Sequence, residues 1–368
     1  MSTQRSLVLK STTQPLFLET VPIPEATSGS VVVKVLGTHV LPYLHEIIDG
    51  SLSYTLKLPL TPGSTAVGRI HAVGGDAVSL KPGQLVLCDI TTRARDDPDA
   101  VMLLGVHGGA AEKLMEGEWR NGSFAEYAKY PLENVFALDE EVLMKKMGYT
   151  IEDFLSMPGF VVPYGGLSEI GLLPGDTVIV APATGKFGGG AVTIALAMGA
   201  TVIAAGRNEA VLEKMKQLYD HTGRIKTVVL TGNEANDAES LAAAAGGKGA
   251  DAYIDFSPPA AANSTHISLA MAALRPFGKA SFMGGIQGKV SINYSMIMMK
   301  SLRIQGRFMY SREMMVRFLK LLEKGNLKLG EANTGVKTTG KFSLDEIQQA
   351  LEVAKKEAGW GTQVILVP

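Results

Sequence analysis

An apolar strand, a glycine-bearing turn and an apolar helix follow one another between residues 177 and 198, and this order constrains the fold most strongly. The turn has the spacing Ala-x-Gly-x-x-Gly, with Ala183, Gly185 and Gly188 in the three positions. In a dinucleotide-binding turn the second glycine lets a pyrophosphate approach the backbone, and the third lets the helix pack closely on the strand. The N–H groups at the helix start bind the phosphates. The segment therefore predicts a Rossmann unit that holds a dinucleotide; the alternative is a glycine-rich loop that only turns the chain.

The next strand, at residues 201–205, bears on the choice between the two nicotinamide coenzymes. An acidic residue at its end would bind the ribose 2′-hydroxyl of NAD, but Arg207 follows and no carboxylate is present there. A guanidinium pairs well with a phosphate, so the sequence favours NADPH/NADP+; the alternative is a solvated surface arginine. Backbone groups at the end of a later strand, at residues 284–285, would hold the carboxamide. The expected cofactor contacts are Ala183, Thr184, Gly185, Lys186, Phe187, Gly188, Gly206, Arg207, Asn208, Gly284 and Gly285.

The rest of the chain predicts two domains that differ in secondary structure. Up to about Leu138, closely spaced strands alternate with Gly/Pro turns, which is typical of an antiparallel barrel. From Thr150 onward, strands alternate with helices, which predicts an α/β domain with a doubly wound parallel sheet. A final strand at 363–367 is expected to return to the first domain. The expected boundaries are 1–148 for the first part of the substrate domain, 149–307 for the Rossmann domain and 308–368 for the return.

Composition excludes several classes of function. The net charge is −1 and the basic residues are scattered, so nucleic acid is not an expected partner. The single cysteine, Cys88, forms no intramolecular disulfide and no Cys-rich zinc site. The first ten residues do not read as a signal peptide, and no apolar run is long enough to span a bilayer. We therefore expect a soluble, cytoplasmic protein without a membrane partner.

Several motifs, taken in order, resemble the medium-chain dehydrogenase/reductase superfamily over nearly the whole chain. The resemblance implies a Rossmann domain inserted into a GroES-like β-barrel domain formed by both chain ends, and often a homodimer formed through the cofactor domains. The motifs are Leu60–Gly63 with Val67–Arg69, Lys81–Val86, Gly122–Tyr127, Leu173–Val178, the glycine turn, Gly249–Asp251 with Ile254–Asp255, and Leu274–Lys279.

The positions that hold zinc in many members of this superfamily carry other residues here. Where zinc-dependent members have Cys, then His-Glu, then Cys or Asp, this chain has Thr38, then Ser64-Thr65, then Pro158. Proline cannot ligate a metal, and neutral hydroxyls are poor zinc ligands. The segment 91–121, where the four-cysteine structural zinc lobe would fall, contains no cysteine. Three histidines, His39, His45 and His71, lack the spacing of a ligand set, so we expect no zinc.

Without zinc no Lewis acid polarises a simple carbonyl, and conjugate reduction becomes the favoured chemistry. Hydride would go to the β-carbon of an enone, and charge would develop on an oxygen that needs only hydrogen bonds. The candidate proton donors are Tyr43, Tyr54 and Tyr164, each equally explained as a packing tyrosine. Thr38 and Ser64 are candidates to hydrogen-bond a substrate oxygen. These features resemble the quinone oxidoreductase-like and enoyl reductase-like branch of the superfamily.

Three hypotheses therefore stand. The first is an NADPH-dependent reductase of activated C=C bonds or quinones, acting on a hydrophobic small molecule. The methionines at 296, 298, 299 and 309 would line its pocket, unless they only fill a core or a dimer contact. The second is a ketone reductase or alcohol dehydrogenase that works without zinc. The third is an NADPH-binding protein with a non-redox or regulatory role.

Overall fold

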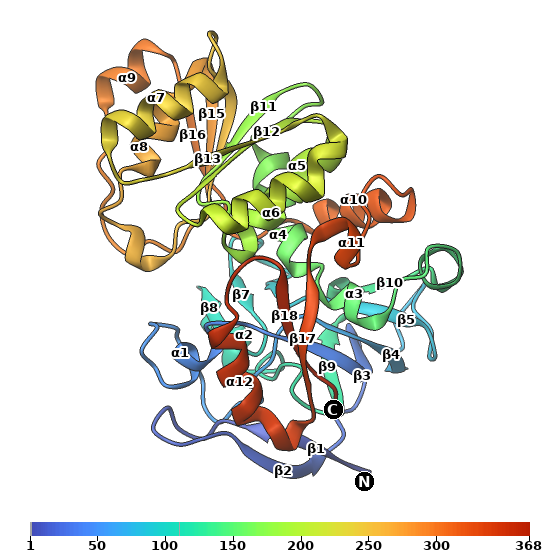
Figure 1. The fold of residues 1–368 in the computed structure, drawn as a ribbon. Helices are drawn as coiled ribbons and strands as arrows, with labels where there is room; N and C mark the ends of the chain where they lie inside the picture. Colours follow the sequence, from blue (N-terminus) through green and yellow to red (C-terminus); the bar gives the residue numbers. More distant parts are fainter. Residues whose placement is uncertain (1, 110) are drawn as a thin grey trace. The chain divides into compact units, whose positions relative to one another are not determined.

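The structure is a computed structural model that describes residues 2–109 and 111–368, and it divides into two compact units (Figure 1). The first unit contains the chain up to Met157, together with Lys337–Ala358 and Thr362–Pro368. The second unit contains Pro158–Val336 and the three residues Gly359–Gly361. Both boundaries fall later than the expected 148 and 307. The second is later because the helix that follows residue 307 packs on the second unit, where the ring of Phe318 contacts that of Tyr164.

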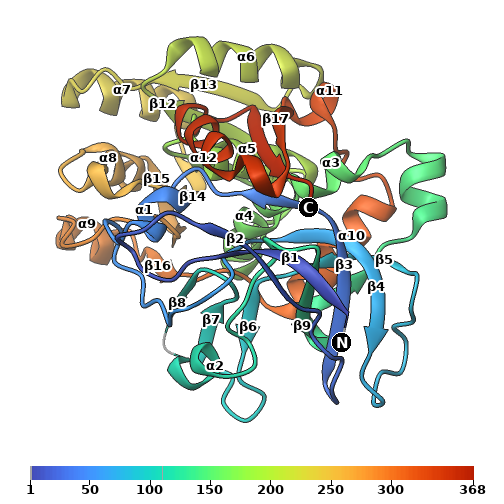
Figure 2. The same cartoon turned by 90° about the horizontal axis from the view of Figure 1, so that it is seen from below.

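The first unit is built around one long strand, β3 (Ser30–Val40). It pairs antiparallel with β4, β9 and β18, and Figure 2 shows β3, β4 and β5 side by side. Val364 of β18 lies opposite Val40, which confirms that the last strand returns to the first domain. The other strands are β1 (Thr3–Val8), β2 (Phe17–Pro22), β4 (Ala66–Val73), β5 (Leu85–Cys88), β9 (Tyr127–Pro131), β10 (Val135–Ala137), β17 (Lys337–Phe342) and β18 (Thr362–Leu366).

Short helices complete the first unit. The helix α3 (Ile151–Leu155) begins with a capping box, in which Thr150 and Asp153 each accept a hydrogen bond from the other's backbone N–H. The strands β17 and β18 run parallel, and a parallel pair needs a crossover, here α12. The remaining helices are α1 (Leu44–Ile48), α2 (Glu112–Glu116), α12 (Ile347–Lys356), the 3-10 helices Leu132–Asn134 and Leu344–Glu346, and the π-helix Glu141–Lys146.

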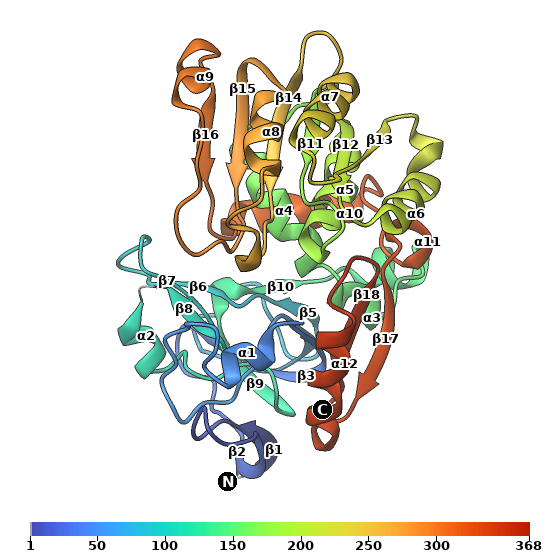
Figure 3. The same cartoon turned by 60° about the vertical axis from the view of Figure 1, so that its left-hand side comes forward.

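The second unit has a six-stranded parallel sheet in the order β13-β12-β11-β14-β15-β16 (Figure 3). From β11 the chain adds strands in one direction as far as β13, and from β14 it adds them in the other. This reversal confirms the expected doubly wound Rossmann sheet, and it places a switch point between β11 and β14. The strands are β11 (Thr177–Val180), β12 (Thr201–Gly206), β13 (Ile225–Val229), β14 (Ala250–Asp255), β15 (Leu274–Phe282) and β16 (Arg303–Gly306).

Helices cover this sheet. Leu241 of α7 and Ile267 of α8 share a buried apolar core with Ile179 of β11 and Ile203 of β12. No helix in residues 2–109 and 111–368 combines the length and the apolar character needed to cross a bilayer. The helices are α4 (Pro158–Glu169), α5 (Lys186–Ala197), α6 (Glu209–Tyr219), α7 (Glu234–Ala245), α8 (His266–Ala272), α9 (Tyr294–Met299), α10 (Arg312–Glu323), α11 (Glu331–Thr334) and the 3-10 helices Asp220–Thr222 and Pro259–Ala261.

The 91–121 segment is ordered in its described part and belongs to the first unit. Its strands β6 (Thr91–Arg93), β7 (Val101–Leu103) and β8 (His107–Gly109) form a small antiparallel sheet. The buried ring of His107 accepts a hydrogen bond from the Lys57 N–H at 3.1 Å and donates one to the Arg120 carbonyl at 2.9 Å. Burial lowers the pKa of His107, so the ring is held in its neutral form.

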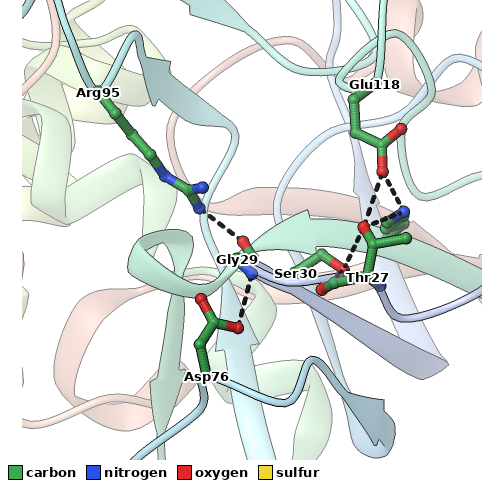
Figure 4. A network of polar contacts seen from close by, with 7 residues as sticks. Thr27, Gly29, Ser30, Asp76, Arg95 and Glu118 are labelled. Atoms are coloured by element: carbon green, nitrogen blue, oxygen red, sulfur yellow. Dashed lines mark hydrogen bonds and ion pairs between the residues drawn. The ribbon is translucent and has the colours of Figure 1, made fainter.

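Charged side chains near both ends of the 91–121 segment hold one turn, at residues 27–30 (Figure 4). Arg95 donates to the Gly29 carbonyl at 2.6 Å, and the Gly29 N–H donates to Asp76 at 2.7 Å. Glu118 accepts from the Thr27 hydroxyl at 3.1 Å. Each such contact near the surface contributes little alone, but together they fix the segment by hydrogen bonds where the resemblance would place a zinc lobe.

Candidate functional site

The glycine turn lies at the carboxyl end of β11, where the chain enters α5. Gly185 is the N-cap residue, in extended conformation, and as a glycine it offers the helix no side-chain cap. A Cβ on Gly188 would overlap the Pro182 carbonyl oxygen and lie 3.0 Å from the Cα of Ala183, whereas a Cβ on Gly185 would have nothing within 4 Å. The two glycines thus differ as the dinucleotide interpretation requires: Gly188 permits close helix packing, and Gly185 faces open space.

The two glycines after Gly188 are also fixed by packing. A Cβ on Gly190 would overlap the carbonyl oxygen of Gly159 at the start of α4. A Cβ on Gly189 would overlap the indole ring of Trp360, and the backbone N–H of Trp360 donates to the Thr184 carbonyl at 3.2 Å. The Gly359–Gly361 stretch thus belongs to the glycine turn although it lies far away in sequence. Sequence reasoning missed it, and the only signal was a tryptophan between two glycines.

The end of β12 presents the arginine predicted to bind an extra phosphate. Gly206 ends the strand, and a Cβ there would lie 2.9 Å from the methyl carbon of Thr184, so the two predicted cofactor residues are in contact. Arg207 follows and is exposed. The side-chain oxygen Oδ1 of Asn208 accepts from the Val211 N–H at 3.2 Å and caps α6. Its side chain therefore has a structural task, and any cofactor contact falls to its remaining amide group.

Lys186 and Phe187 occupy the first turn of α5. The aliphatic stem of Lys186 lies over Gly159, since a Cβ on that glycine would be 3.7 Å from the lysine Cε. Burial lowers the pKa of Lys186 to about 7, far below the ordinary lysine value. The ring of Phe187 stacks on that of Phe256, with centroids 5.9 Å apart. The helix start therefore carries an amine that titrates near neutrality beside an aromatic pair.

The predicted carboxamide-binding residues, Gly284 and Gly285, follow β15 and stay joined to the segment after β14. The Met283 N–H donates to the Asp255 carbonyl at 3.1 Å, and the Gly285 N–H donates to the Ser257 carbonyl at 2.8 Å. The backbone is therefore held rigidly at the carboxyl ends of β14 and β15. These ends lie across the switch point from Arg207, where the other half of a dinucleotide would extend.

The candidate proton donors fall in both units. Tyr43 and Tyr54 lie in the first unit, close enough for Tyr54 to raise the pKa of Tyr43 after the larger effect of burial. Burial also raises the pKa of Tyr54, whose ring covers Gly108. Tyr164 lies in α4 of the second unit, buried, with its ring centroid 6.0 Å from that of Phe318. The contacts of Tyr164 favour packing, while the other two remain candidate donors.

Thr38 and Ser64 lie close together in the first unit, joined through Ser123. The Thr38 and Ser123 hydroxyl oxygens are 2.5 Å apart, and the Ser123 hydroxyl donates to the Ser64 carbonyl at 2.8 Å. The Ser64 hydroxyl donates to the carbonyl of His39. All three serine and threonine side chains are buried. Their hydroxyls are thus engaged within the protein, and their predicted contact with a substrate oxygen remains a prediction. Sequence reasoning missed Ser123.

Comparison with known proteins agrees with this geometry. Residues 27–140 match the family model described as alcohol dehydrogenase GroES-like domain, and residues 187–324 match the one described as zinc-binding dehydrogenase. An L-threonine 3-dehydrogenase of Anaeromyxobacter sp. (strain K) is 26% identical over 94% of this chain and 93% of its own length. A quinone oxidoreductase of Rattus norvegicus is 27% identical over 82% and 79%. An E. coli CFT073 alcohol dehydrogenase solved with NADH superposes with a TM-score of 0.79, at 22% identity and complete coverage of both chains.

The chain belongs to the medium-chain dehydrogenase/reductase superfamily. This medium-chain dehydrogenase/reductase has the two-domain architecture expected from the sequence, with a GroES-like domain formed by both chain ends. The superfamily consists of oxidoreductases, and the named relatives span threonine, alcohol and quinone chemistry.

The residues that the resemblance places at the metal-ligand positions are not zinc ligands in this medium-chain dehydrogenase/reductase. Thr38 and Ser64 are held in the hydroxyl network described above, and Pro158, the first residue of α4, has no donor atom in its side chain. Within residues 2–109 and 111–368, no three His, Cys, Asp or Glu side chains gather as metal ligands would. His71 instead contacts the ring of Tyr127, with centroids 4.9 Å apart. The residues at these positions do not fit zinc.

Proposed function

We propose that this protein is a zinc-independent, NADPH-dependent oxidoreductase that reduces an activated C=C bond or a quinone of a hydrophobic small molecule. The hydroxyl network carries the proposal, because Thr38 and Ser64 stand at the metal-ligand positions and are bonded to Ser123 and to the His39 carbonyl. With no Lewis acid, the favoured acceptors are those whose developing charge needs only hydrogen bonds. The exposed Arg207 at the end of β12 supports the preference for NADPH.

The residues of the second unit would bind and orient the coenzyme. The N–H groups of the first turn of α5 would bind the pyrophosphate, with Gly185 leaving room for it. Arg207 would bind the 2′-phosphate, and the backbone of Gly284 and Gly285 would hold the carboxamide. The bound coenzyme would supply the hydride. The glycine turn and the Met283–Gly285 segment thus mark the two halves of one dinucleotide site across the switch point.

The reduced substrate also needs a proton, and the first unit contains two phenols suited to hold it. Burial raises the pKa of both Tyr43 and Tyr54, so each keeps its proton at neutral pH and can donate a hydrogen bond to a developing enolate oxygen. We assign them as the candidate proton donors in preference to Tyr164.

A panel of acceptors tests the function. Oxidation of NADPH, followed by its absorbance, is measured with enones, quinones, ketones and aldehydes after purification in the presence of a chelator. Turnover confined to enones or quinones supports the proposal. Turnover of simple ketones or aldehydes instead would favour the activity named for the alcohol dehydrogenase relatives, measured in its reducing direction. NADPH binding without turnover of any acceptor would favour a non-redox or regulatory role, and stoichiometric zinc in the active protein would contradict the mechanism.

The affinity for NADPH should weaken as the pH rises from about 7 to about 10, because of Lys186. In the free protein burial lowers the pKa of this amine to about 7. Phosphates bound at the start of α5 would raise it again, so binding takes up a proton between the two pKa values. The dissociation constant should then increase up to about tenfold per pH unit in that window. Fluorescence titration with NADPH measures this, and Lys186→Met should flatten the profile. A pH-independent constant in the unmodified protein would contradict the assignment.

We also propose that two copies of the chain associate through the edge strand β16. All four residues of this strand are exposed, and the strand pairs on one side only, with β15. The neighbouring helix α9 exposes Tyr294, Met298 and Met299, at 81%, 61% and 75%. An exposed apolar patch beside an unpaired strand edge suits a self-complementary contact. The occupant that fits best is a second copy, which would extend the sheet.

Substituting Ile304 on β16 by glutamate should convert the proposed dimer into monomer. The charge enters a twofold contact twice, so we expect the dissociation constant to rise at least about a hundredfold, given the cost of burying unpaired like charges. Sedimentation velocity at several protein concentrations measures the change. Leu173→Glu is the matched control, since Leu173 is 60% exposed in the same unit and lies outside β16 and α9. A monomeric unmodified protein at micromolar concentration would overturn this proposal.

A further inference from the structure

A chain of buried polar side chains lies directly behind the Met283–Gly285 segment. The hydroxyl of Ser257 donates to Oδ1 of Asp255, and its oxygen lies 2.7 Å from Nε2 of His266. Nδ1 of the same ring lies 2.6 Å from the hydroxyl of Ser264. Asp255, Ser257 and His266 are 4%, 1% and 7% exposed, whereas Ser264 reaches the surface. Sequence reasoning did not single out Ser257, Ser264 or His266.

The chemistry of these groups fixes the direction of every hydrogen bond when His266 is neutral. An ionised carboxylate only accepts, so Ser257 must give its proton to Asp255 and accept from the His266 Nε2–H. Nδ1 then accepts from the Ser264 hydroxyl. Each donor meets one acceptor, and the hydroxyl of Tyr253, 3.2 Å from the same Oδ1, adds to the solvation of the carboxylate. Such a fully satisfied network is rigid.

This chain of side chains supports the backbone of Gly284 and Gly285. A Cβ on Gly284 would overlap Oδ2 of Asp255 and would lie 2.7 Å from the Ser257 nitrogen. The Gly285 N–H is bonded to the carbonyl of Ser257 itself. The Asp255 carboxylate therefore lies against the backbone of Gly284. Because the Ser257 carbonyl accepts from the Gly285 N–H, a movement of Ser257 would also displace Gly285.

We propose that Ser257 and His266 are positioning residues for the nicotinamide ring of the coenzyme. The inference rests on the proposed function, which puts the adenosine half near Arg207 and the nicotinamide half at the carboxyl ends of β14 and β15. Neither side chain needs to touch the ring. They fix Asp255 and the backbone at residues 283–285, which would then meet the carboxamide in one geometry. A structural role alone would stabilise the unit without distinguishing the two halves of the ligand.

Two ligands separate these readings: NADPH, which has both halves, and 2′,5′-ADP, which has only the adenosine half with its phosphates. Ser257→Ala and His266→Leu should each weaken NADPH binding by about tenfold, the effect of losing a positioning hydrogen bond, and leave 2′,5′-ADP binding unchanged. His266→Gln should recover much of the loss, because its amide N–H can replace the Nε2–H donor. Ser268→Ala is the control: its hydroxyl lies on the same helix and bonds the Thr265 carbonyl at 2.8 Å, outside the chain.

Equal losses for both ligands, or no loss for either, would overturn the proposal. If the unmodified protein bound neither ligand, the proposed function would fail instead, so the two failures are distinguishable. If a variant does not fold, hydrogen exchange of the unmodified protein still tests the proposal. In hydrogen exchange, NADPH should slow peptides spanning residues 283–285 and 2′,5′-ADP should not; identical protection by both ligands would count against the proposal.

Discussion

Replacing Arg207 by glutamate should raise the dissociation constant for NADPH about a hundredfold, while that for NADH should change little or improve. A charge-assisted hydrogen bond to the 2′-phosphate is worth about 1.5–3 kcal/mol, and about 1.4 kcal/mol corresponds to tenfold in affinity. Charge reversal adds repulsion of the phosphate. The same carboxylate would be placed to accept from the 2′-hydroxyl of NADH, the role an acidic residue has at this position in NAD-binding Rossmann domains.

The matched control for this experiment is Lys214→Glu, which makes the same change of charge on the exposed face of α6. It separates a direct contact with the phosphate from a general change in the field around the site. Isothermal titration with both coenzymes gives two dissociation constants for each variant, which are compared with the same two constants of the unmodified protein. If the unmodified protein binds NADH as tightly as NADPH, Arg207 is a surface residue and the coenzyme preference proposed here is wrong.

The sequence predicts those elements whose start is indicated by neighbouring residues, such as a helix-capping side chain. The sequence indicates where α6 and α10 begin, because Asn208 and Ser311 are typical helix caps and the apolar residues that follow repeat at helical spacing. Strand β17 escaped notice because its sequence, Lys-Thr-Thr-Gly-Lys-Phe, is polar and only partly buried. The parallel partner that defines it, β18, comes after a crossover and leaves no signal in the strand itself.

The sequence predicted the parts of the site that depend on backbone conformation. It did not predict the parts formed by side chains that are distant in sequence. The glycine spacing located the turn because only glycine fits where a Cβ would strike Pro182. The contact of Trp360 with Gly189 joins a residue near the end of the chain to one in its middle, and neither segment carries a sequence signal that predicts the other. Ser123 engages the hydroxyl of Thr38, and the His39 carbonyl accepts from the hydroxyl of Ser64; hydrogen bonds between such distant positions have no sequence signature.

The two glycines of the turn should respond in opposite ways to the same substitution. Gly188→Ala places a methyl group against the Pro182 carbonyl and the Ala183 Cα, both of them backbone atoms that cannot rotate away. Overpacking of this kind costs about 3 kcal/mol or more, only partly offset by the about 1 kcal/mol that alanine gains over glycine in a helix. The midpoint of denaturant unfolding should therefore fall clearly, and coenzyme binding should fall with it because α5 can no longer lie against β11.

Gly185→Ala should instead preserve the fold and remove the affinity for the coenzyme. Gly185 has φ −85° and ψ 171°, which alanine adopts freely, and its Cβ would meet no protein atom within 4 Å. The unfolding free energy should fall by only about 1 kcal/mol, the cost of a poorer N-cap. The methyl group would nevertheless fill the space through which the pyrophosphate approaches the backbone, so NADPH binding should weaken far more than stability. Equal NADPH affinity in Gly185→Ala and the unmodified protein would mean that no dinucleotide lies across this turn.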